Sequence, residues 1–457
     1  MTHDGARESW GKLGNEIMTI NSAFTGQPLP DRADVVIIGA GIMGCATAYY
    51  LAKRGIKAVL LDKSRIAGAQ SSRAWGFVRI MSRDEAEVPL MQEAMKIWPQ
   101  LETELQSDLD WRQEGCLFMA TDKRELEGYE EWMPVARQYD LDTRLITGNE
   151  LGRMMPNLRD PALGGLWSPT DGHAEPRKVA PAFAQRAAES GALIYEGCGA
   201  TGLEVVNGKV DTVLTEAGPI RTKAVLVSAG VTSWRILKML GRHLPQQYVR
   251  STALRTNRIP PLTGAAFFGH QIGFRQRKDG SLTLADEVST DIDLTLGHLR
   301  AMRWFLPPML QMAGMFTFHL NNLTLRDLLH RLPWRPEAQQ PWIHDRDPQI
   351  PANTNRVHRA IRNLRHRFPE AASVQAVESW ACHIDCIPDG IPVIGPLPGI
   401  DGLLVATGYC GHGFAMGPIT GQLMTELIAD GQPRLDLKAF RFSRFAEGDV
   451  KKPRSIY

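Results

Sequence analysis

The fold of this 457-residue chain is decided by the stretch Asp34-Val-Val-Ile-Ile-Gly39-Ala-Gly41-Ile-Met-Gly44. Its apolar run, residues 35–38, predicts a strand that is buried on both faces. Gly39 permits a tight turn, Gly41 lets the backbone approach a pyrophosphate, and Gly44 lets the next helix pack closely on the strand. The phosphates of such a ligand bind at the amide groups that open the helix.

The residues that follow complete a dinucleotide-binding unit. We expect a helix of small residues over 45–54, with Gly55 as its stop, and a second buried strand over 57–62. The second strand ends at Asp62, which is placed to accept hydrogen bonds from ribose hydroxyls. These parts occur in the required order within about 30 residues. An acid at position 62, where an NADP site carries arginine, favours FAD or NAD.

The composition is that of an ordinary globular protein with room for two domains. A net charge of +2 argues against a nucleic-acid partner, and six scattered cysteines suit a reducing compartment. Residues 1–30 lack the apolar segment of a signal peptide and are interpreted as a polar leader. We therefore expect a cytoplasmic protein.

Three later segments separate FAD from NAD. They are a hydroxyl-rich loop at residues 66–76, a buried strand that begins near 223, and a strand with a glycine-rich turn over 402–417. Ser71 and Ser72 of the loop are candidates to cap a helix and donate to a phosphate. A nucleotide fold closed by segments so far apart suits a long cofactor such as FAD.

In combination these segments resemble the D-amino acid oxidase and glycine/sarcosine oxidase superfamily, whose members oxidise C–N bonds with FAD. The resemblance rests on the glycine-rich opening, the Ser228-Ala-Gly230 strand end and the turn Gly408-Tyr-Cys-Gly-His-Gly-Phe414. It runs from about Arg32 to Phe445. It implies an α/β, Rossmann-type FAD-binding domain that is discontinuous in sequence, and an α+β substrate domain built on an antiparallel sheet.

The expected FAD-binding domain comprises residues 31–90, 170–240 and 375–445. The expected substrate domain comprises residues 91–169 and 241–374, and it includes an insertion at 286–370. Residues 446–457 form a tail. A hairpin is predicted over 269–285, with Asp279-Gly280 in its turn.

The motif and the resemblance assign a set of residues to the cofactor: Gly39, Gly41, Ile42, Met43, Gly44, Asp62, Lys63, Ser71, Ser72, Arg73, Ala200, Ala229, Gly230, Trp234, Cys382, Gly411, His412, Gly413 and Phe414. Cys382 falls where sarcosine-type enzymes tether FAD through a thioether, whereas the deaminase-like pattern has alanine there, so both a covalent and a free FAD stay open. A metal site that includes Cys382 and His412 is disfavoured, because its ligand spacing is loose.

Two subgroups of the superfamily compete. The segments 66–74 and 273–280 resemble bacterial membrane-associated L-amino acid deaminases, whereas the turn 408–414 and Arg79 resemble monomeric sarcosine oxidase. The sarcosine-type resemblance places Arg79 against the flavin ring. A salt bridge from Arg79 to the acidic cluster at 84–87 is the competing interpretation.

An amino-acid substrate needs a fixed cation for its carboxylate, and arginine provides one with a bidentate fork. The resemblance to the deaminases puts their carboxylate-binding arginine at Arg275, although Arg275 also suits a surface strand beside Arg277. Glycine-oxidase-type enzymes place this arginine at a position that reads Ile384, and sarcosine-type enzymes place a lysine where Ala415 stands. We therefore expect Arg275, Arg79 and His412 to carry the catalytic roles, with backbone amides around His412 stabilising the reduced flavin.

The insertion is unusual in composition. Residues 304–325 carry no formal charge, and residues 300–367 carry eleven arginines and no lysine. Pro307-Pro308 argues against a transmembrane helix. Two interpretations remain for residues 300–335: a buried cap with a basic flank, or a docking surface for the inner membrane or an electron acceptor. Sarcosine-type oxidases activate oxygen with a lysine where Thr283 stands, which favours a quinone or protein acceptor.

The expected function is an FAD-dependent amino acid dehydrogenase or deaminase. It converts an α-amino acid to an imine, which water converts to the oxo acid and ammonia. An N-methyl amino acid oxidase or demethylase stays open as an alternative, and so does a flavin-carrying subunit of a heteromeric amine or opine oxidase. The sequence does not distinguish L, D and N-methyl substrates, and it leaves the oligomeric state open.

Overall fold

The computed structural model of the chain describes residues 28–160, 162–286, 290–311, 316–329, 346–347 and 349–453. Most of the expected leader, the end of the expected tail, and two methionines of the uncharged run, Met312 and Met315, lie outside these ranges.

One layer of the described chain is a six-stranded sheet. Its strands, in spatial order, are β20 (Val393–Pro396), β21 (Leu403–Thr407), β12 (Ala224–Val227), β1 (Val35–Ile38), β2 (Ala58–Leu61) and β8 (Leu193–Tyr195). All neighbours are parallel except β20 and β21. The predicted strand at 35–38 is confirmed, and it lies in the interior of this sheet.

Alternate residues of β1 explain why the run is apolar throughout. Val35 and Ile37 pack in a core with helices α1 (Ile42–Lys53), α5 (Pro176–Glu189) and α11 (Gly413–Asp430). Val36 and Ile38 pack in a second core with the meander β9 (Ala200–Val206), β10 (Lys209–Thr215) and β11 (Gly218–Arg221). A strand covered on both faces has no polar side to present.

The second large sheet has ten strands in the described residues. Its order is β18 (Phe316–His319), β17 (Thr290–Asp293), β13 (Gln247–Thr256), β16 (Leu282–Asp286), β15 (Ile272–Gln276), β14 (Ala266–Gly269), β4 (Cys116–Ala120), β6 (Gly164–Ser168) and β5 (Arg144–Thr147), with β19 (Ala376–Cys386) also paired to β13. It is mainly antiparallel, with parallel pairs at β14–β4 and β17–β18. The hairpin predicted over 269–285 is present as β15 and β16, and Gly280 in its turn has a φ of +83°.

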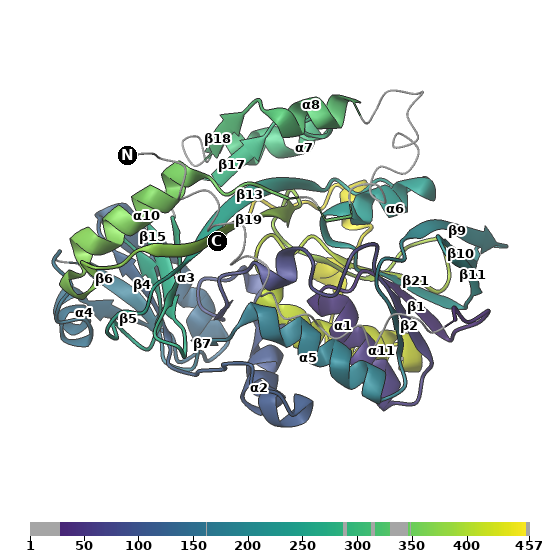
Figure 1. Ribbon diagram of the computed structural model, residues 1–457, viewed down its shortest axis with the longest axis horizontal. Coiled ribbons are helices and arrows are strands. Elements are labelled where there is room, and N and C mark those ends of the chain that lie inside the picture. The colour runs from purple at the N-terminus through teal and green to yellow at the C-terminus, as the bar shows by residue number, and fades with distance from the viewer. Residues whose placement is uncertain are drawn as a thin grey trace, which may run out of the picture.

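Smaller elements cover these sheets. They are β3 (Phe77–Val78), paired with β7 (Gly172–His173), and the helices α2 (Val88–Leu105), α3 (Lys123–Gln138), α4 (Gly148–Met154), α6 (Ser233–Met239), α10 (Thr354–Arg367) and α12 (Arg444–Glu447). Figure 1 shows α10 lying along one side of the ten-stranded sheet, while α1, α5 and α11 lie together at the six-stranded sheet.

Two elements differ from the expected domain division, which otherwise remains a prediction. β19 was expected in the FAD-binding domain, but it pairs with β13 over ten positions of the large sheet. From residue 91 on, α2 was expected in the substrate domain, but Met91, Trp98 and Leu101 belong to the core of the six-stranded sheet. Local sequence cannot show either arrangement, because both depend on partners far away in the chain.

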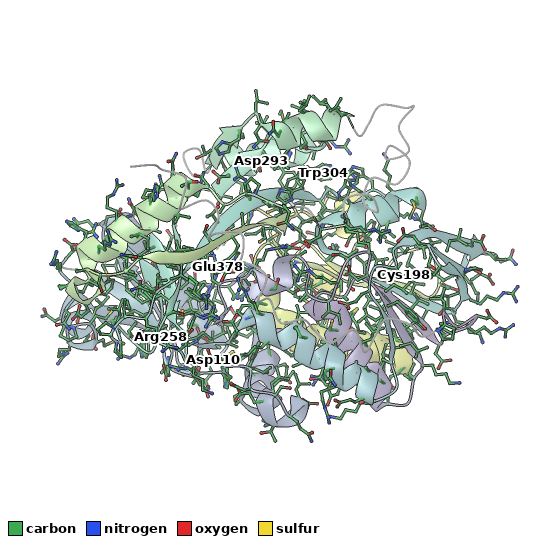
Figure 2. The ribbon with its side chains drawn as sticks, in the orientation of Figure 1. Asp110, Cys198, Arg258, Asp293, Trp304 and Glu378 are labelled. Atoms are coloured by element: carbon green, nitrogen blue, oxygen red, sulfur yellow. The ribbon has the colours of Figure 1, made fainter. Side chains whose placement is uncertain are left out.

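The first part of the insertion extends the ten-stranded sheet at its β13 side and carries two helices outside it. It contains β17, β18, α7 (Leu296–Gln311) and α8 (Asn322–Leu329), which Figure 1 shows projecting above β13. Buried ion pairs fasten it: Arg250 Nε lies 2.8 Å from an Asp293 carboxylate oxygen, and Arg356 Nη2 lies 2.8 Å from one of Asp291. Asp293 and Trp304, labelled in Figure 2, lie at the base of this part of the insertion.

Candidate functional site

A deep cavity runs between the six-stranded sheet and the ten-stranded sheet. One end is lined by residues that follow β1, β2 and β12, and the opposite wall is built by β13 and β19. Ligands of open α/β sheets bind at the carboxyl ends of the strands, so the position of the cavity is that of a nucleotide site.

The glycine-rich turn shapes the first end of this cavity. Gly39 has a φ of +110°, and a Cβ there would lie 2.5 Å from the Ser228 carbonyl oxygen, so only glycine fits. Asp62 accepts a hydrogen bond from the Ala40 amide at 2.8 Å. A Cβ on Gly41 would meet only Ser71 Oγ, at 3.1 Å, and would otherwise project into open space. The backbone at Gly41 is therefore bare toward the cavity, as close approach of a pyrophosphate requires.

Most residues assigned to the cofactor line this cavity: Gly39, Gly41, Ile42, Met43, Asp62, Lys63, Ser71, Arg73, Ala200, Ala229, Gly230, Cys382, Gly411, His412, Gly413 and Phe414. Gly44, Ser72 and Trp234 are not in its lining. A Cβ on Gly44 would lie 2.0 Å from the Gly39 carbonyl oxygen, so Gly44 serves the close packing of α1 on the turn. Ser72 Oγ donates to the Ala69 carbonyl oxygen, and the Trp234 amide donates to Gln246, so both serve local structure.

The residues of the cavity fit an FAD molecule. The bare turn at Gly41 and the half-buried acid Asp62 suit the phosphates and ribose of the nucleotide half. In the described residues, His412 Nε2 is buried, lines the cavity and makes no hydrogen bond. A buried polar atom without a partner is costly, so its position favours a polar ligand group.

His412 is held by a buried carboxylate. Its Nδ1 lies 3.2 Å from Glu87, which is fully buried where a short 3-10 turn meets α2. Burial lowers the pKa of His412 to about 4, outweighing the opposing effect of Glu87. His412 is therefore neutral near pH 7, with the proton on Nδ1 shared with Glu87 and Nε2 left as an acceptor.

Two buried arginines enter the cavity beside this pair. Arg83 Nη1 lies 3.6 Å from Glu87, and Arg83 Nε donates to the Arg79 carbonyl oxygen at 3.1 Å. Arg79 donates to the Met81 carbonyl oxygen and forms no ion pair with any described carboxylate. The sequence left open a salt bridge between Arg79 and the acidic cluster at 84–87. In the structure Arg83 pairs with this cluster, through Glu87, in place of Arg79. Burial lowers the pKa of Arg79, since its charge is removed from water without a close counter-ion.

Aromatic rings surround the Arg79 end. Arg79 Cζ lies 5.1 Å from the centroid of Phe118, and Phe118 stacks on Phe268 at 4.8 Å. Trp75 and Phe77 complete this wall, with ring centroids 5.9 Å apart. In the described residues the site thus combines an apolar chamber with a buried arginine, Arg79, that forms no ion pair.

Arg275 does not reach this chamber, contrary to the prediction. It is fully buried outside the cavity lining, its Nε donates to the Trp75 carbonyl oxygen at 2.6 Å, and its Nη2 lies 2.8 Å from Glu175. Arg275 shares the Glu175 carboxylate with Arg277, which also lies 2.8 Å from it, and Gly76 packs directly against the Arg275 guanidinium. Arg275 therefore supports the wall that carries Trp75.

Four further positions were compared with known enzymes in the sequence analysis, and they differ in whether they line the cavity. Cys382 and Ile384 line the cavity, and burial raises the pKa of the Cys382 thiol to about 12. Thr283 is buried in β16 and Ala415 in α11, and neither lines the cavity. The lack of a cation at Thr283 therefore says nothing about charge inside the chamber.

Sequence reasoning missed several residues of the site. They are Arg83, Glu87, Trp75, Phe77, Phe118 and Phe268, together with Asp171, which accepts from the Ile80 amide at 2.8 Å. The spacing of Arg83 and Glu87, four residues apart, was a usable signal for their pairing. Trp75 and Phe77 are neighbours in sequence, whereas Phe118 on β4 and Phe268 on β14 come from distant strands and gave no local signal.

Comparison with known proteins agrees with this geometry. The family model described as "DAO: FAD dependent oxidoreductase" matches residues 34–427. Mitochondrial sarcosine dehydrogenase of Homo sapiens is 26% identical over 94% of this chain, and the chain spans only 43% of that protein. Sarcosine oxidase subunit beta of Rhizobium meliloti (strain 1021) is 27% identical over 92% of this chain and 91% of its own length.

A solved structure extends the likeness to the whole described fold. L-amino acid deaminase from Proteus myxofaciens, in complex with anthranilate, superposes with a TM-score of 0.86 at 25% identity, covering 92% of this chain and 95% of that chain. The family match spans most of the sequence and agrees with the glycine-rich turn and the cavity behind it. The chain therefore belongs to the DAO family of FAD-dependent oxidoreductases.

Proposed function

We propose that this protein is an FAD-dependent amino acid dehydrogenase or deaminase that oxidises the C–N bond of an α-amino acid. The observation that carries the proposal is Arg79: a buried arginine without an ion-pair partner among the described residues, at the aromatic end of the cavity. A substrate carboxylate would supply the missing counter-ion through a bidentate hydrogen bond.

The remaining residues suit this chemistry. Bound FAD accepts a hydride equivalent from the carbon next to nitrogen. Arg79 would fix the carboxylate, and Trp75, Phe118 and Phe268 would exclude water and hold the substrate side chain. Neutral His412, oriented by Glu87, presents an acceptor nitrogen that could take a hydrogen bond from the substrate amine. The imine product hydrolyses to oxo acid and ammonia.

An anaerobic substrate scan tests the proposal. The holoprotein is mixed without oxygen with a panel of L- and D-amino acids, their N-methyl derivatives, and the matching amines that lack a carboxylate. We expect bleaching of the flavin absorbance by primary amino acids and none by the decarboxylated amines. Bleaching by amines alone would contradict the role of Arg79.

An N-methyl amino acid oxidase or demethylase is the second candidate. It is favoured by the likeness to sarcosine dehydrogenase and by the aromatic chamber, because ring faces attract methylated ammonium groups. In the same scan this function would give faster bleaching by N-methyl amino acids, with formaldehyde as a product.

A third candidate is a flavin-carrying subunit of a heteromeric oxidase of amines or opines. It is favoured by the match to a sarcosine oxidase subunit beta over nearly its full length. Copurification of a second chain at fixed stoichiometry, with no flavin bleaching by any amine in the isolated chain, would support it.

We also propose that the insertion docks on the inner membrane, where a quinone accepts the electrons. Of thirteen large apolar side chains exposed in the described residues, eight lie between Leu299 and Leu329, including Leu320 at 79% exposure. Apolar patches of this kind mark interaction surfaces. Within the described ranges, no helix combines the length and apolar character that crossing a bilayer requires.

The attachment of FAD is a separate question. Cys382 lines the cavity, which is compatible with a thioether. If the bond exists, acid precipitation leaves the yellow colour in the pellet, and Cys382→Ala releases it.

A further inference from the structure

A short part of the insertion reaches across to the nucleotide side of the cavity. Arg346 Nη1 donates to the carbonyl oxygens of Lys63 at 2.7 Å and Gly197 at 2.9 Å, and its Nη2 pairs with Glu216. Lys63 follows β2, Gly197 precedes β9, and Glu216 follows β10. One side chain thus joins three loops of the six-stranded sheet and its meander.

The next residue makes a second set of contacts. An Asp347 carboxylate oxygen lies 3.5 Å from Arg65, and the other lies 3.7 Å from Arg73. Arg65 and Arg73 stand at either end of the hydroxyl-rich loop that carries Ser71. Arg346 and Asp347 therefore hold the loop after β2 at both of its ends.

These contacts surround the part of the cavity that suits the adenosine of FAD. Arg346 and Ile350 line the cavity together with Asp62, Lys63 and Ala200. In a Rossmann-type fold the acid that ends the second strand faces the adenosine ribose, whereas the flavin extends away from it. Arg346 thus lies at the adenosine end, remote from Arg79 and the aromatic chamber.

We propose that Arg346 and Asp347 form a clamp that retains the adenosine half of FAD, so that the insertion serves cofactor retention. Neither residue carries out chemistry: both are positioning residues that hold cavity-lining loops closed. A single exposed ion pair contributes little to stability. The clamp differs because Arg346 binds two backbone carbonyls and one carboxylate at once, and opening it would free the loops between which the nucleotide enters.

Flavin release measures the clamp directly. Arg346→Ala is made in a Cys382→Ala background, so that no thioether through Cys382 can conceal dissociation. Release of FAD after dilution into a scavenging apoflavoprotein is followed by flavin fluorescence. We expect the dissociation rate constant to rise about tenfold over the Cys382→Ala parent, while the melting temperature of the apoprotein stays unchanged. Asp347→Asn should act in the same direction, because it removes both ion pairs.

Arg54→Ala is the matched control. Arg54 pairs with Asp430 at 2.7 Å between α1 and the end of α11, has similar exposure, and does not line the cavity. Arg54→Ala, made in the same Cys382→Ala background, should release FAD as fast as the Cys382→Ala parent does. An unchanged rate in both Arg346→Ala and Asp347→Asn would overturn the clamp, and so would a fall in apoprotein melting temperature that accounts for all of the faster release.

Discussion

At the scale of single residues, Arg79 and Arg275 show how a nearby carboxylate separates two similar buried side chains. Both are buried arginines near the same wall of the cavity. Arg275 pairs with Glu175, which it shares with Arg277, whereas Arg79 forms no ion pair in the described part of the chain. A ligand carboxylate gains little binding free energy from an arginine that already has a counter-ion. It gains most from a buried arginine that has none.

Arg79→Met should weaken substrate binding. Loss of a charge-assisted hydrogen bond costs about 1.5–3 kcal/mol, so KM for the best amino acid should rise roughly 10- to 150-fold. Stopped-flow reduction of the flavin measures this as a higher Kd for substrate. Arg275→Met is the comparison: it should lower protein stability with a smaller effect on Kd. Equal Kd values in Arg79→Met and wild type would remove Arg79 as the anchor.

Gly41→Val should abolish FAD binding. The added side chain would project from the bare turn into the space expected for the pyrophosphate, with only Ser71 Oγ close to its Cβ. The purified variant should be colourless and folded, as judged by far-ultraviolet circular dichroism. Gly55→Ala is a control that changes a glycine with no neighbouring atom within 4 Å, and it should stay yellow. Its left-handed φ of +74° costs some stability.

Ionisation of Asp171 should lower the free energy of unfolding as the pH rises from about 4 toward 7. Burial raises its pKa to about 7, from an ordinary value near 4. Between these pH values the folded chain holds a proton that the unfolded chain has released, so each pKa unit of difference costs about 1.4 kcal/mol as the pH approaches 7. Asp171→Asn cannot ionise, and its melting temperature should fall less between pH 5 and pH 8. Parallel melting curves for the two proteins would contradict the raised pKa.

At the scale of elements, the sequence predicted those helices and strands whose arrangement depends on neighbouring residues in the chain. The unit of β1, the glycine-rich turn, α1 and β2 follows from a short continuous stretch, and so does the hairpin of β15 and β16. The pairing of β19 with β13, and the packing of α2 on α11, join segments more than 100 residues apart. The aromatic chamber and the place of Arg275 depend on such pairings, so the sequence could not reveal them.

The exposed face of α7 and α8 should bind membranes. Leu299, Met302 and Leu306 lie three and four residues apart and are each more than 40% exposed, and Leu325 adds to the face from α8. Each leucine that inserts fully gains up to about 1.5–3 kcal/mol. The wild-type protein should sediment with vesicles that contain phosphatidylglycerol, and less so at high salt because basic contacts are screened.

A triple variant tests this face. Replacing Leu299, Leu306 and Leu325 with serine should abolish sedimentation with the vesicles. Replacing Met154 and Leu163, which are exposed elsewhere, should leave it unchanged. If all three proteins sediment alike, the insertion is a cap without a docking role.

At the scale of the whole molecule, the insertion is connected to both halves of the site. Buried ion pairs join it to the ten-stranded sheet, and Arg346 joins it to the loops of the six-stranded sheet. Figure 1 shows its helices α7 and α8 at the outer edge of the molecule, and these helices carry the exposed side chains of Leu299, Leu306 and Leu325. The proposed docking surface and the proposed clamp on the cofactor thus belong to one insertion.

The proposed docking on the membrane leads to a prediction about the electron acceptor. An enzyme held at a membrane by its apolar face has access to quinone in the bilayer. We therefore expect slow turnover with oxygen and at least tenfold faster turnover with a short-chain quinone or an artificial dye. Hydrogen peroxide formation and dye reduction, measured on one preparation with one amino acid, give the two rates. The triple serine variant should keep its rate with the water-soluble dye and lose its rate with quinone embedded in vesicles, because only the second acceptor requires docking. Peroxide formation as fast as dye reduction would make the protein an oxidase, and the apolar face would then need another partner.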